Sequence, residues 1–318
     1  MSRRDAVGEM WRYITNVFLG DAHSAMAILA TFMAGGHALL VGPIGSGKTT
    51  LARALAQAIG GTYKRVQVNN ETLPSDIIGF TVYSRDGDSR VVKGPIFANV
   101  TLLDELNRAP PRTLSALLES MQERHVTIDG TPLPLPYPHM VVATMNRTEE
   151  ELGFTSRLPI AVLDRFAAAI EVNHVPREYE EAVVRKADEI EDSLEKPQPL
   201  SLKPEEAGKL MEAARGVYVD DSVLNYIFDV VERVRGDRRV GVRLSTRAPI
   251  SMYRLARSLA FLNGRGYVVP DDVKEAARLA LPHRVVLREE YEEDVSPNQV
   301  VEDALNEVPA PTVAVREQ

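Results

Sequence analysis

The stretch VGPIGSGKTTL, Val41 to Leu51, decides the fold, because it contains the pattern G-x-x-x-x-G-K-T from Gly42 to Thr49. The apolar run 38–41 precedes it, and residues 51–59, with apolar side chains at helical spacing, follow it. Strand, glycine loop and helix form the context in which this pattern binds phosphate. Glycines let the backbone curl until its N–H groups point inward, and the helix start adds a positive dipole end. A glycine turn without a nucleotide is the weaker alternative.

The loop predicts a nucleotide site with Mg²⁺. Lys48 can reach the terminal phosphates, and the hydroxyl of Thr49 can ligand the metal. The residues expected to bind the nucleotide are Gly42, Pro43, Ile44, Gly45, Ser46, Gly47, Lys48, Thr49 and Thr50.

Composition excludes several other site chemistries. The chain has 318 residues, enough for two domains, with 44% hydrophobic and 26% charged residues, as in ordinary globular proteins. It contains 0 cysteines, which excludes disulfides, thiol catalysis and cysteine metal sites and fits a reducing compartment. No two of the 6 histidines are spaced i, i+3 or i, i+4, so no local metal motif is predicted.

The charge is unevenly distributed along the chain. Residues 289–318 carry nine acidic side chains and one basic side chain, Arg316, which accounts for the whole net charge of −8. A neutral body with an acidic end argues against a general nucleic-acid binder, which would present a basic face.

The longest stretch without charge, 25–42, raises the question of a membrane segment. Gly35, Gly36 and His37 interrupt it, and we interpret it as the end of a buried helix, a turn and a buried strand. Glu9 and Arg12 interrupt any signal-peptide core near the start. We therefore expect a cytoplasmic protein without a membrane segment.

A second apolar strand, 100–103, ends in Asp104 and Glu105. Acids often end a strand at the solvent, but here they follow a phosphate loop by some fifty residues. Parallel strands bring their carboxyl ends to one edge of a sheet, where the nucleotide lies. We therefore expect Asp104 to hold the Mg²⁺ shell and Glu105 to polarise the attacking water.

The remaining pattern predicts an α/β fold followed by helices. Residues 63–68, 140–146 and 167–172 complete a five-stranded parallel sheet, and β-like runs around Asp-Gly pairs predict hairpins at about 80–92 and 124–138. Two helices are expected in 5–34, where Trp11 is assigned to the core.

The domains are expected at 1–175, α/β and nucleotide-binding, at 176–288, all helical, and at 289–318, an acidic and flexible tail. In the helical part, one helix is expected from about 178 to 194.

The stretch DELNRAPPRTLSALLESMQE, residues 104–123, resembles the MoxR family of AAA+ ATPases. Gly35-Gly36-His37, Leu163-Asp-Arg-Phe166 and the segment 266–273 match the same family, and the resemblance extends over about 17–285. It implies an AAA+ P-loop parallel-sheet core with a C-terminal all-α lid domain. It also implies ATP as the nucleotide and a homo-oligomeric ring, usually of six copies.

The resemblance assigns further roles to single residues. Asn146 would be sensor 1 and orient the water, and Arg165 would be the arginine finger that reaches the nucleotide of the adjacent subunit. Arg247 would be sensor 2 and contact the γ-phosphate of its own subunit. Both hairpins would face a substrate or partner, with Tyr83 and Arg85 as candidate contacts.

The chain departs from the family pattern near two of these residues. Met145-Asn146-Arg147 replaces Gln-Asn-Pro, which makes Arg147 and Arg157 rival finger candidates. In the lid motif, Ser245-Thr246-Arg247 keeps the arginine but lacks the proline. Asn69 or Asn70 is either a polar switch that couples substrate to Glu105 or an ordinary turn asparagine.

Three functions are compatible with these residues. The leading hypothesis is Mg²⁺-dependent ATP hydrolysis in a ring that remodels, matures or activates a partner protein, either a client or a separate von Willebrand factor A domain protein. An AAA+ nucleic-acid motor or loader is the second, although no basic stripe supports it. The third is a nucleotide-sensing scaffold without useful turnover, against which the intact catalytic set argues.

Overall fold

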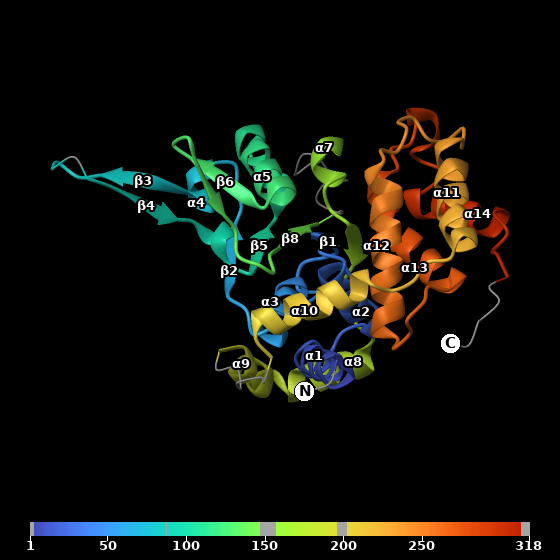
Figure 1. Cartoon of the computed structure of the whole chain (residues 1–318), viewed down its shortest axis with the longest axis horizontal. Coiled ribbons are helices and arrows are strands. Elements are labelled where there is room, and N and C mark those ends of the chain that lie inside the picture. Colours follow the sequence, from blue (N-terminus) through green and yellow to red (C-terminus); the bar gives the residue numbers. More distant parts are fainter. Residues whose placement is uncertain (1–2, 87, 147–156, 196–201, 313–318) are drawn as a thin grey trace.

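The computed structural model describes residues 3–86, 88–146, 157–195 and 202–312. Its centre is a parallel five-stranded sheet, which confirms the predicted fold class (Figure 1). The order across the sheet is β2 (Tyr63–Gln67), β5 (Val100–Asp104), β8 (Met140–Met145), β1 (Ala38–Val41) and β9 (Ala168–Glu171). β1, β5 and β8 are buried along their whole length, as expected for strands covered on both faces.

Alternate residues of β1 belong to two different cores. Ala38 and Leu40 pack with α1 (Arg3–Val17), α2 (Ala22–Met33) and α3 (Lys48–Ala58). Leu39 and Val41 pack on the other face, which α4 (Pro74–Ile78) and α5 (Pro111–Glu123) cover. The two-residue period of a strand thus places one helical layer on each side of the sheet.

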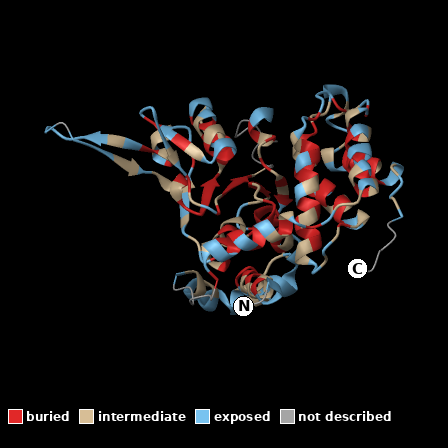
Figure 2. Cartoon of the chain, in the orientation of Figure 1, coloured by how far each residue is buried: buried red, intermediate tan, exposed pale blue. Residues whose placement is uncertain are grey.

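Two antiparallel hairpins lie at the predicted positions. β3 (Gly79–Tyr83) pairs with β4 (Ser89–Lys93), and this hairpin projects far from the body and is largely exposed (Figure 2). β6 (His125–Ile128) pairs with β7 (Thr131–Pro134). Asp129 and Gly130 between them have φ of 47° and 77°, the left-handed pair that a two-residue hairpin turn requires.

The chain after Pro176 is helical in its described part, apart from isolated bridges. The helices are α8 (Arg177–Arg185), α9 (Ala187–Glu195), α10 (Pro204–Arg215), α11 (Asp221–Arg235), α12 (Arg247–Leu262) and α13 (Pro270–Ala280). The single helix expected over 178–194 is therefore two helices, α8 and α9, with Lys186 between them. No helix in the described ranges is long and apolar enough to cross a membrane.

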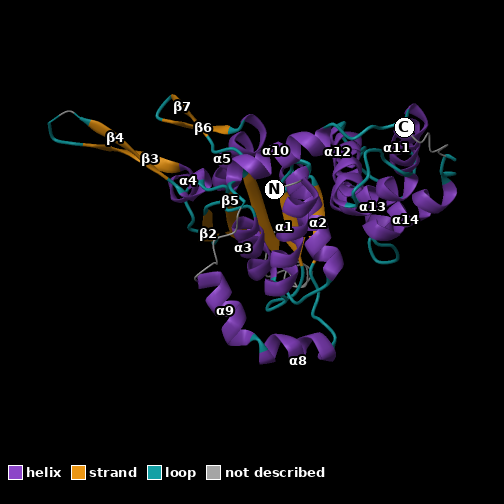
Figure 3. Ribbon diagram, turned by 60° about the horizontal axis from the view of Figure 1, so that its bottom comes forward, coloured by secondary structure: helices purple, strands orange, loops and turns teal. Residues whose placement is uncertain are grey.

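Helices α8 and α9 have no buried residue and run along the outside of the α/β layer (Figure 3). The hydroxyl of Tyr13 donates to the Ser193 carbonyl at 3.2 Å, and Arg53 donates to the Leu194 carbonyl at 2.7 Å. These bonds attach the end of α9 to α1 and α3, so the first helices after Pro176 still contact the α/β layer.

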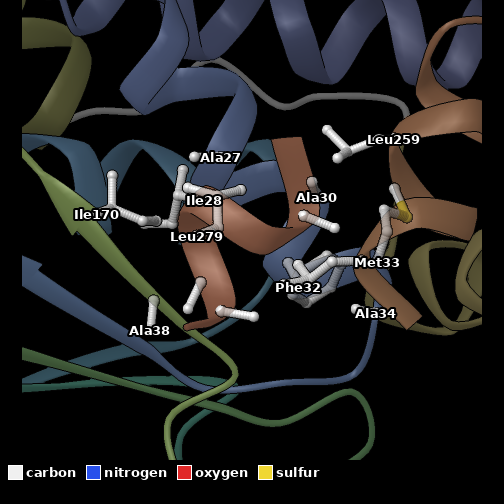
Figure 4. Close-up of a cluster of buried hydrophobic side chains, with 14 of the residues drawn as sticks. Ala27, Ile28, Ala30, Phe32, Met33, Ala34, Ala38, Ile170, Leu259 and Leu279 are labelled. Atoms are coloured by element: carbon white, nitrogen blue, oxygen red, sulfur yellow. The ribbon is translucent and has the colours of Figure 1, made fainter. Parts of the chain in front are cut away.

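Helix α2 lies between the sheet and the lid helices (Figure 4). Its side chains Ile28 and Phe32 are buried in one cluster with Ala38 and Ile170 of the sheet and with Leu259 and Leu279 of α12 and α13. The lid therefore shares a hydrophobic core with the α1–α3 face of the sheet, while the core on the other face is separate.

The expected flexible tail, 289–318, contains a packed helix, α14 (Pro297–Glu307), so the expectation is wrong for these residues. Val300, Val301, Ala304 and Leu305 are buried against the lid, and the hydroxyl of Ser296 caps the helix start. Its acids pair with lid arginines: Glu302 with Arg278, Asp303 with Arg239 and Glu307 with Arg233. Acidic composition concealed an amphipathic helix, while 313–318 lie outside the described residues.

Replacing Leu305 by alanine tests whether α14 is part of the lid. Leu305 is 5% exposed, and such a truncation in a core costs about 2–5 kcal/mol. We expect a clearly lower urea midpoint for Leu305→Ala, and for the exposed neighbour control Asn306→Ala a change within about 0.5 kcal/mol. Equal midpoints for the two variants would show that the helix does not contribute to folding.

Candidate active site

The phosphate loop connects the end of β1 to the start of α3. Gly45 and Gly47 have φ of 79° and 89°, in the left-handed region that favours glycine. A Cβ on Gly42 would lie 2.0 Å from the carbonyl oxygen of Val172, so this position has no room for a side chain. No side chain caps the first turn of α3, whose N–H groups point toward the loop and suit an anion.

Lys48 extends over this loop. Its Nζ donates to the carbonyls of Gly42 at 2.8 Å and Pro43 at 2.5 Å and lies 3.5 Å from the Ser46 hydroxyl. Ile44, at the loop tip, is 70% exposed. The ammonium group is thus held at the concave side of a loop built to bind phosphate.

The two acids at the end of β5 point in different directions because Glu105 has left-handed backbone angles, φ 60° and ψ 49°. Such a conformation is costly for a residue other than glycine and is typical of functional sites. The hydroxyl of Thr144 on β8 donates to Oδ1 of Asp104 at 2.5 Å and accepts the Glu105 N–H at 2.9 Å. One hydroxyl on the neighbouring strand therefore holds both the Asp104 carboxylate and the Glu105 backbone.

Each acid also has an arginine partner that the sequence analysis missed. Arg65 on β2 donates to Oδ2 of Asp104 from Nε at 3.0 Å and from Nη2 at 2.6 Å. Arg108 lies 2.9 Å from the Glu105 carboxylate. The sequence could have indicated the pair with Arg108, because this residue follows Glu105 by three positions. The pair of Arg65 with Asp104 becomes visible only once the pairing of β2 with β5 is known.

Asn69 has a local role in the described contacts. Its Oδ1 accepts from the Glu71 N–H at 2.8 Å and from the Thr72 hydroxyl at 3.2 Å. These are the bonds of an asparagine that stabilises a turn, and they favour an ordinary turn asparagine over a polar switch.

The oxygen ligands at this edge suit Mg²⁺, which binds through one or two protein oxygens and substrate phosphates. Thr49 supplies a hydroxyl in the first turn of α3, and Asp104 supplies a buried carboxylate on the strand that α3 packs against. Within the described ranges, no group of three His, Cys, Asp or Glu residues could hold a metal by itself. The donors present therefore fit a metal that arrives with phosphate.

Asn146 directly follows β8, between the ends of β5 and β1. The N–H of Gly42 donates to the carbonyl of Met145 at 3.3 Å, which holds the loop close to this strand end. Of the rival finger candidates, Arg147 lies outside the described residues. Arg157 pairs with Glu292 at 3.1 Å.

Arg165 lies at the opposite edge of the sheet from the loop. β1 and β9 are parallel, with Ala38 level with Ala168 and Val41 level with Glu171. Arg165 therefore lies before the amino end of β9, whereas Gly42 follows the carboxyl end of β1. Its guanidinium donates to the carbonyl of Ala161 and to Gln122 at 3.3 Å.

Arg247, at the start of α12, lies beside Arg165, and both contact Gln122. It donates to Oδ2 of Asp164 at 3.3 Å and to Oε1 of Gln122 at 3.2 Å. Burial and the nearby Arg247 charge both lower the pKa of Arg165. Arg247 is thus held beside Asp164 and Gln122, and its contact with the γ-phosphate of its own subunit stays a prediction.

Comparisons with known proteins agree with this fold. A family model described as "ATPase family associated with various cellular activities (AAA)" matches residues 37–168, and a model of the AAA lid domain matches 233–304. Chaperone MoxR1 of Mycobacterium tuberculosis is 34% identical over 312 residues, 94% of this chain and 81% of that protein. The chain belongs to the MoxR family of AAA+ ATPases.

Other relatives extend this assignment over nearly the whole chain. The protein YeaC of Bacillus subtilis is 36% identical, covering 96% of this chain and 95% of that protein, and the protein MoxR of Paracoccus denitrificans is 31% identical with 88% of each covered. The crystal structure of a candidate ATPase from Cytophaga hutchinsonii superposes with a TM-score of 0.87 at 33% identity, over 98% of this chain and 96% of that one. The lid match ends at residue 304 and so extends into α14, which supports the place of this helix in the lid.

In this MoxR-family chain, Asp164 connects the lid to the part of the chain that precedes β9, which carries Arg165 and is called the finger edge below. Its carboxylate accepts from Arg284 at 3.0 Å and from the hydroxyl of Ser245 at 2.8 Å. Arg284 is 3% exposed and also donates to the carbonyl of Phe166 at 2.7 Å. Burial alone would raise the pKa of Asp164, but the Ser245 hydroxyl and Arg284 outweigh it and hold the pKa below its ordinary value. Burial lowers the pKa of Arg284 to about 10.

Replacing Asp164 by asparagine should destabilise the lid and change its acid sensitivity. Removing one partner of a buried ion pair costs about 3–5 kcal/mol. Because the folded-state pKa of Asp164 is depressed, its contribution is complete above its unfolded pKa of about 3.9 and is lost as the pH falls through the folded value.

The measurement is the free energy of unfolding from pH 7 down to pH 2. Asp164→Asn should be less stable at pH 7, and its deficit relative to the unmodified protein should shrink at the acid end. Asp229→Asn, an exposed acid on α11, is the control and should follow the unmodified curve. A deficit independent of pH would contradict the role of the Asp164 charge.

Proposed function

We propose that this chain hydrolyses ATP with Mg²⁺ in a head-to-tail ring and uses the energy to remodel, mature or activate a partner protein. One observation carries the proposal. The loop and the acids follow the carboxyl ends of β1 and β5, whereas Arg165 precedes the amino end of β9 and shares Gln122 with Arg247. This separation supports a site to which two copies contribute, one with its loop and acids and the other with its arginines.

At the loop edge, this chain's residues bind the nucleotide and activate water. Lys48 binds the terminal phosphates, and Thr49 and Asp104 would hold the Mg²⁺. When bound, the metal would neutralise the charge that develops on the phosphates. Glu105 orients the attacking water and accepts its proton, and Asn146 holds that water in line. For Glu105 to do so, its carboxylate must leave Arg108, 2.9 Å away.

At the finger edge, Arg165 and Arg247 act on the nucleotide of a neighbouring copy. Both donate to Gln122, so a neighbour that contacts this edge meets the two guanidinium groups together. An arginine that arrives in this way is worth roughly 10³ to 10⁵ in rate. An interface of one edge with the other is heterologous, and it closes into a ring when the rotation permits, with six copies as the expected number.

The partner site is proposed at the β3–β4 hairpin. Phe80, Val82 and Tyr83 on it are 49%, 43% and 69% exposed, an unusual display of apolar side chains on a projecting hairpin. The relative from Mycobacterium tuberculosis is named a chaperone, which favours a protein client or a separate von Willebrand factor A domain partner. The balanced charge of the body gives no comparable support to a nucleic-acid motor. A cytoplasmic location stays a prediction.

Replacing Glu105 by glutamine tests the hydrolytic assignment. The amide cannot accept the proton of the water, so turnover of ATP should fall at least about a hundredfold. Binding of ATP should persist, because Lys48, Thr49 and Asp104 remain. A phosphate-release assay and an equilibrium nucleotide titration measure the two quantities, and undiminished turnover would refute the role of Glu105.

Mixing two inactive variants tests whether Arg247 acts between copies. Arg247→Ala retains a complete loop edge, and Glu105→Gln retains a complete finger edge. If Arg247 acts on its neighbour, about a quarter of the interfaces in an equal mixture have both intact edges. Activity should then appear on mixing, whereas an arginine acting on its own subunit would give no activity above that of the separate variants.

A further inference from the structure

Arg65 lies on the sheet face that the phosphate-loop helix covers. Along β2, Tyr63 packs against the core beneath α3 and Val66 against the opposite core, so Arg65 and Gln67 share the α3 side. Gln67 is level with Asp104. Arg65, two residues earlier on the same face of the strand, reaches that carboxylate diagonally. Its Nη2 also donates to Oε1 of Gln67 at 2.8 Å, which steadies the guanidinium in this orientation.

Both carboxylate oxygens of Asp104 are already in use. Oδ1 accepts the Thr144 hydroxyl at 2.5 Å, and Oδ2 accepts two N–H groups of Arg65, the shorter at 2.6 Å. The Asp104 side chain is only 12% exposed, so the carboxylate relies on these partners rather than on water. Charge-assisted bonds of this kind are among the stronger hydrogen bonds in proteins.

A metal ion that uses Asp104 must contend with this guanidinium. Arg65 carries a fixed positive charge, because guanidinium groups stay protonated in proteins. A second cation near Oδ2 is repelled by it and draws the same oxygen away from the Arg65 N–H groups. Arg65 is 49% exposed, so its side chain is free to swing into solvent once it is displaced, and solvent moderates the repulsion.

We propose that Arg65 is a positioning residue that competes with Mg²⁺ for Asp104 and thereby sets the Mg²⁺ concentration at which the nucleotide site fills. This inference rests on the proposed function, since it assumes that Asp104 serves the metal of a bound nucleotide. In the nucleotide-free chain Arg65 acts as the counter-ion of Asp104. Without it, the carboxylate is more available to Mg²⁺.

The test is a binding titration rather than an activity assay. A fluorescent, non-hydrolysable ATP analogue is titrated with Mg²⁺ in a metal buffer, and the half-saturating free Mg²⁺ concentration is read for the full chain. Arg65→Gln should lower that concentration roughly threefold to tenfold, as expected for the loss of a half-exposed charged partner. Arg65→Lys keeps the charge without the paired N–H groups and should lie between the two.

Lys64→Gln is the matched control, because it removes the same charge from the neighbouring residue, which points to the other face of β2. It should leave the half-saturating Mg²⁺ concentration within about twofold of the original. If Arg65→Gln does not fold, Arg65→Lys carries the test by itself.

An unchanged or higher half-saturating concentration in the Arg65 variants would overturn the inference, and a higher one would mean that Arg65 prepares Asp104 for the metal. If the unmodified chain binds no nucleotide at any Mg²⁺ concentration, the proposed function fails instead. The two failures are therefore distinguishable.

Discussion

The parallel register of β1 with β8 and β9 is the constraint on which the rest of the site depends. Together with the parallel pairing of β2 with β5 and of β5 with β8, it aligns all five strands in one direction, so that their carboxyl ends meet at one edge and their amino ends at the other. The loop follows the carboxyl end of β1, whereas Arg165 precedes the amino end of β9. The distance between these groups is thus a result of chain direction and not of any side-chain contact.

At both edges, the acidic side chains form ion pairs with arginines. Asp104 and Glu105 are paired with Arg65 and Arg108, and at the far edge Asp164 is shared by Arg247 and Arg284. Pairing lowers the cost of keeping these carboxylates out of water. In the proposed mechanism, Asp104 and Glu105 exchange these arginine partners for the metal and the attacking water.

Local pattern was sufficient to predict much of the fold. The buried strands appear as apolar runs, and the hairpins as Asp-Gly pairs between β-like stretches. The loop and the acids could be found because their motif is local. The sequence interpretation failed where composition concealed periodicity, as in α14, whose buried face at Val300 and Leu305 is surrounded by acids.

The residues that could not be placed are those whose role depends on distant contacts. Arg65 and Asp104 are 39 positions apart, and only the pairing of β2 with β5 brings them together. Arg247 and Asp164 are 83 positions apart, and the edge to which Arg247 belongs is determined by the docking of α12. The motif identifies Arg247 as a sensor 2 arginine, but the groups that surround it depend on where α12 begins in the fold.

The burial of α2 between the sheet and the lid has a mechanical consequence. Because Ile28 and Phe32 contribute to a single core with β9, α12 and α13, bending the lid away from the sheet would expose apolar surface that is now dry. A hinge at this place would be energetically expensive. The sheet and the lid are therefore expected to move together as one rigid unit, with the β3–β4 hairpin projecting from it.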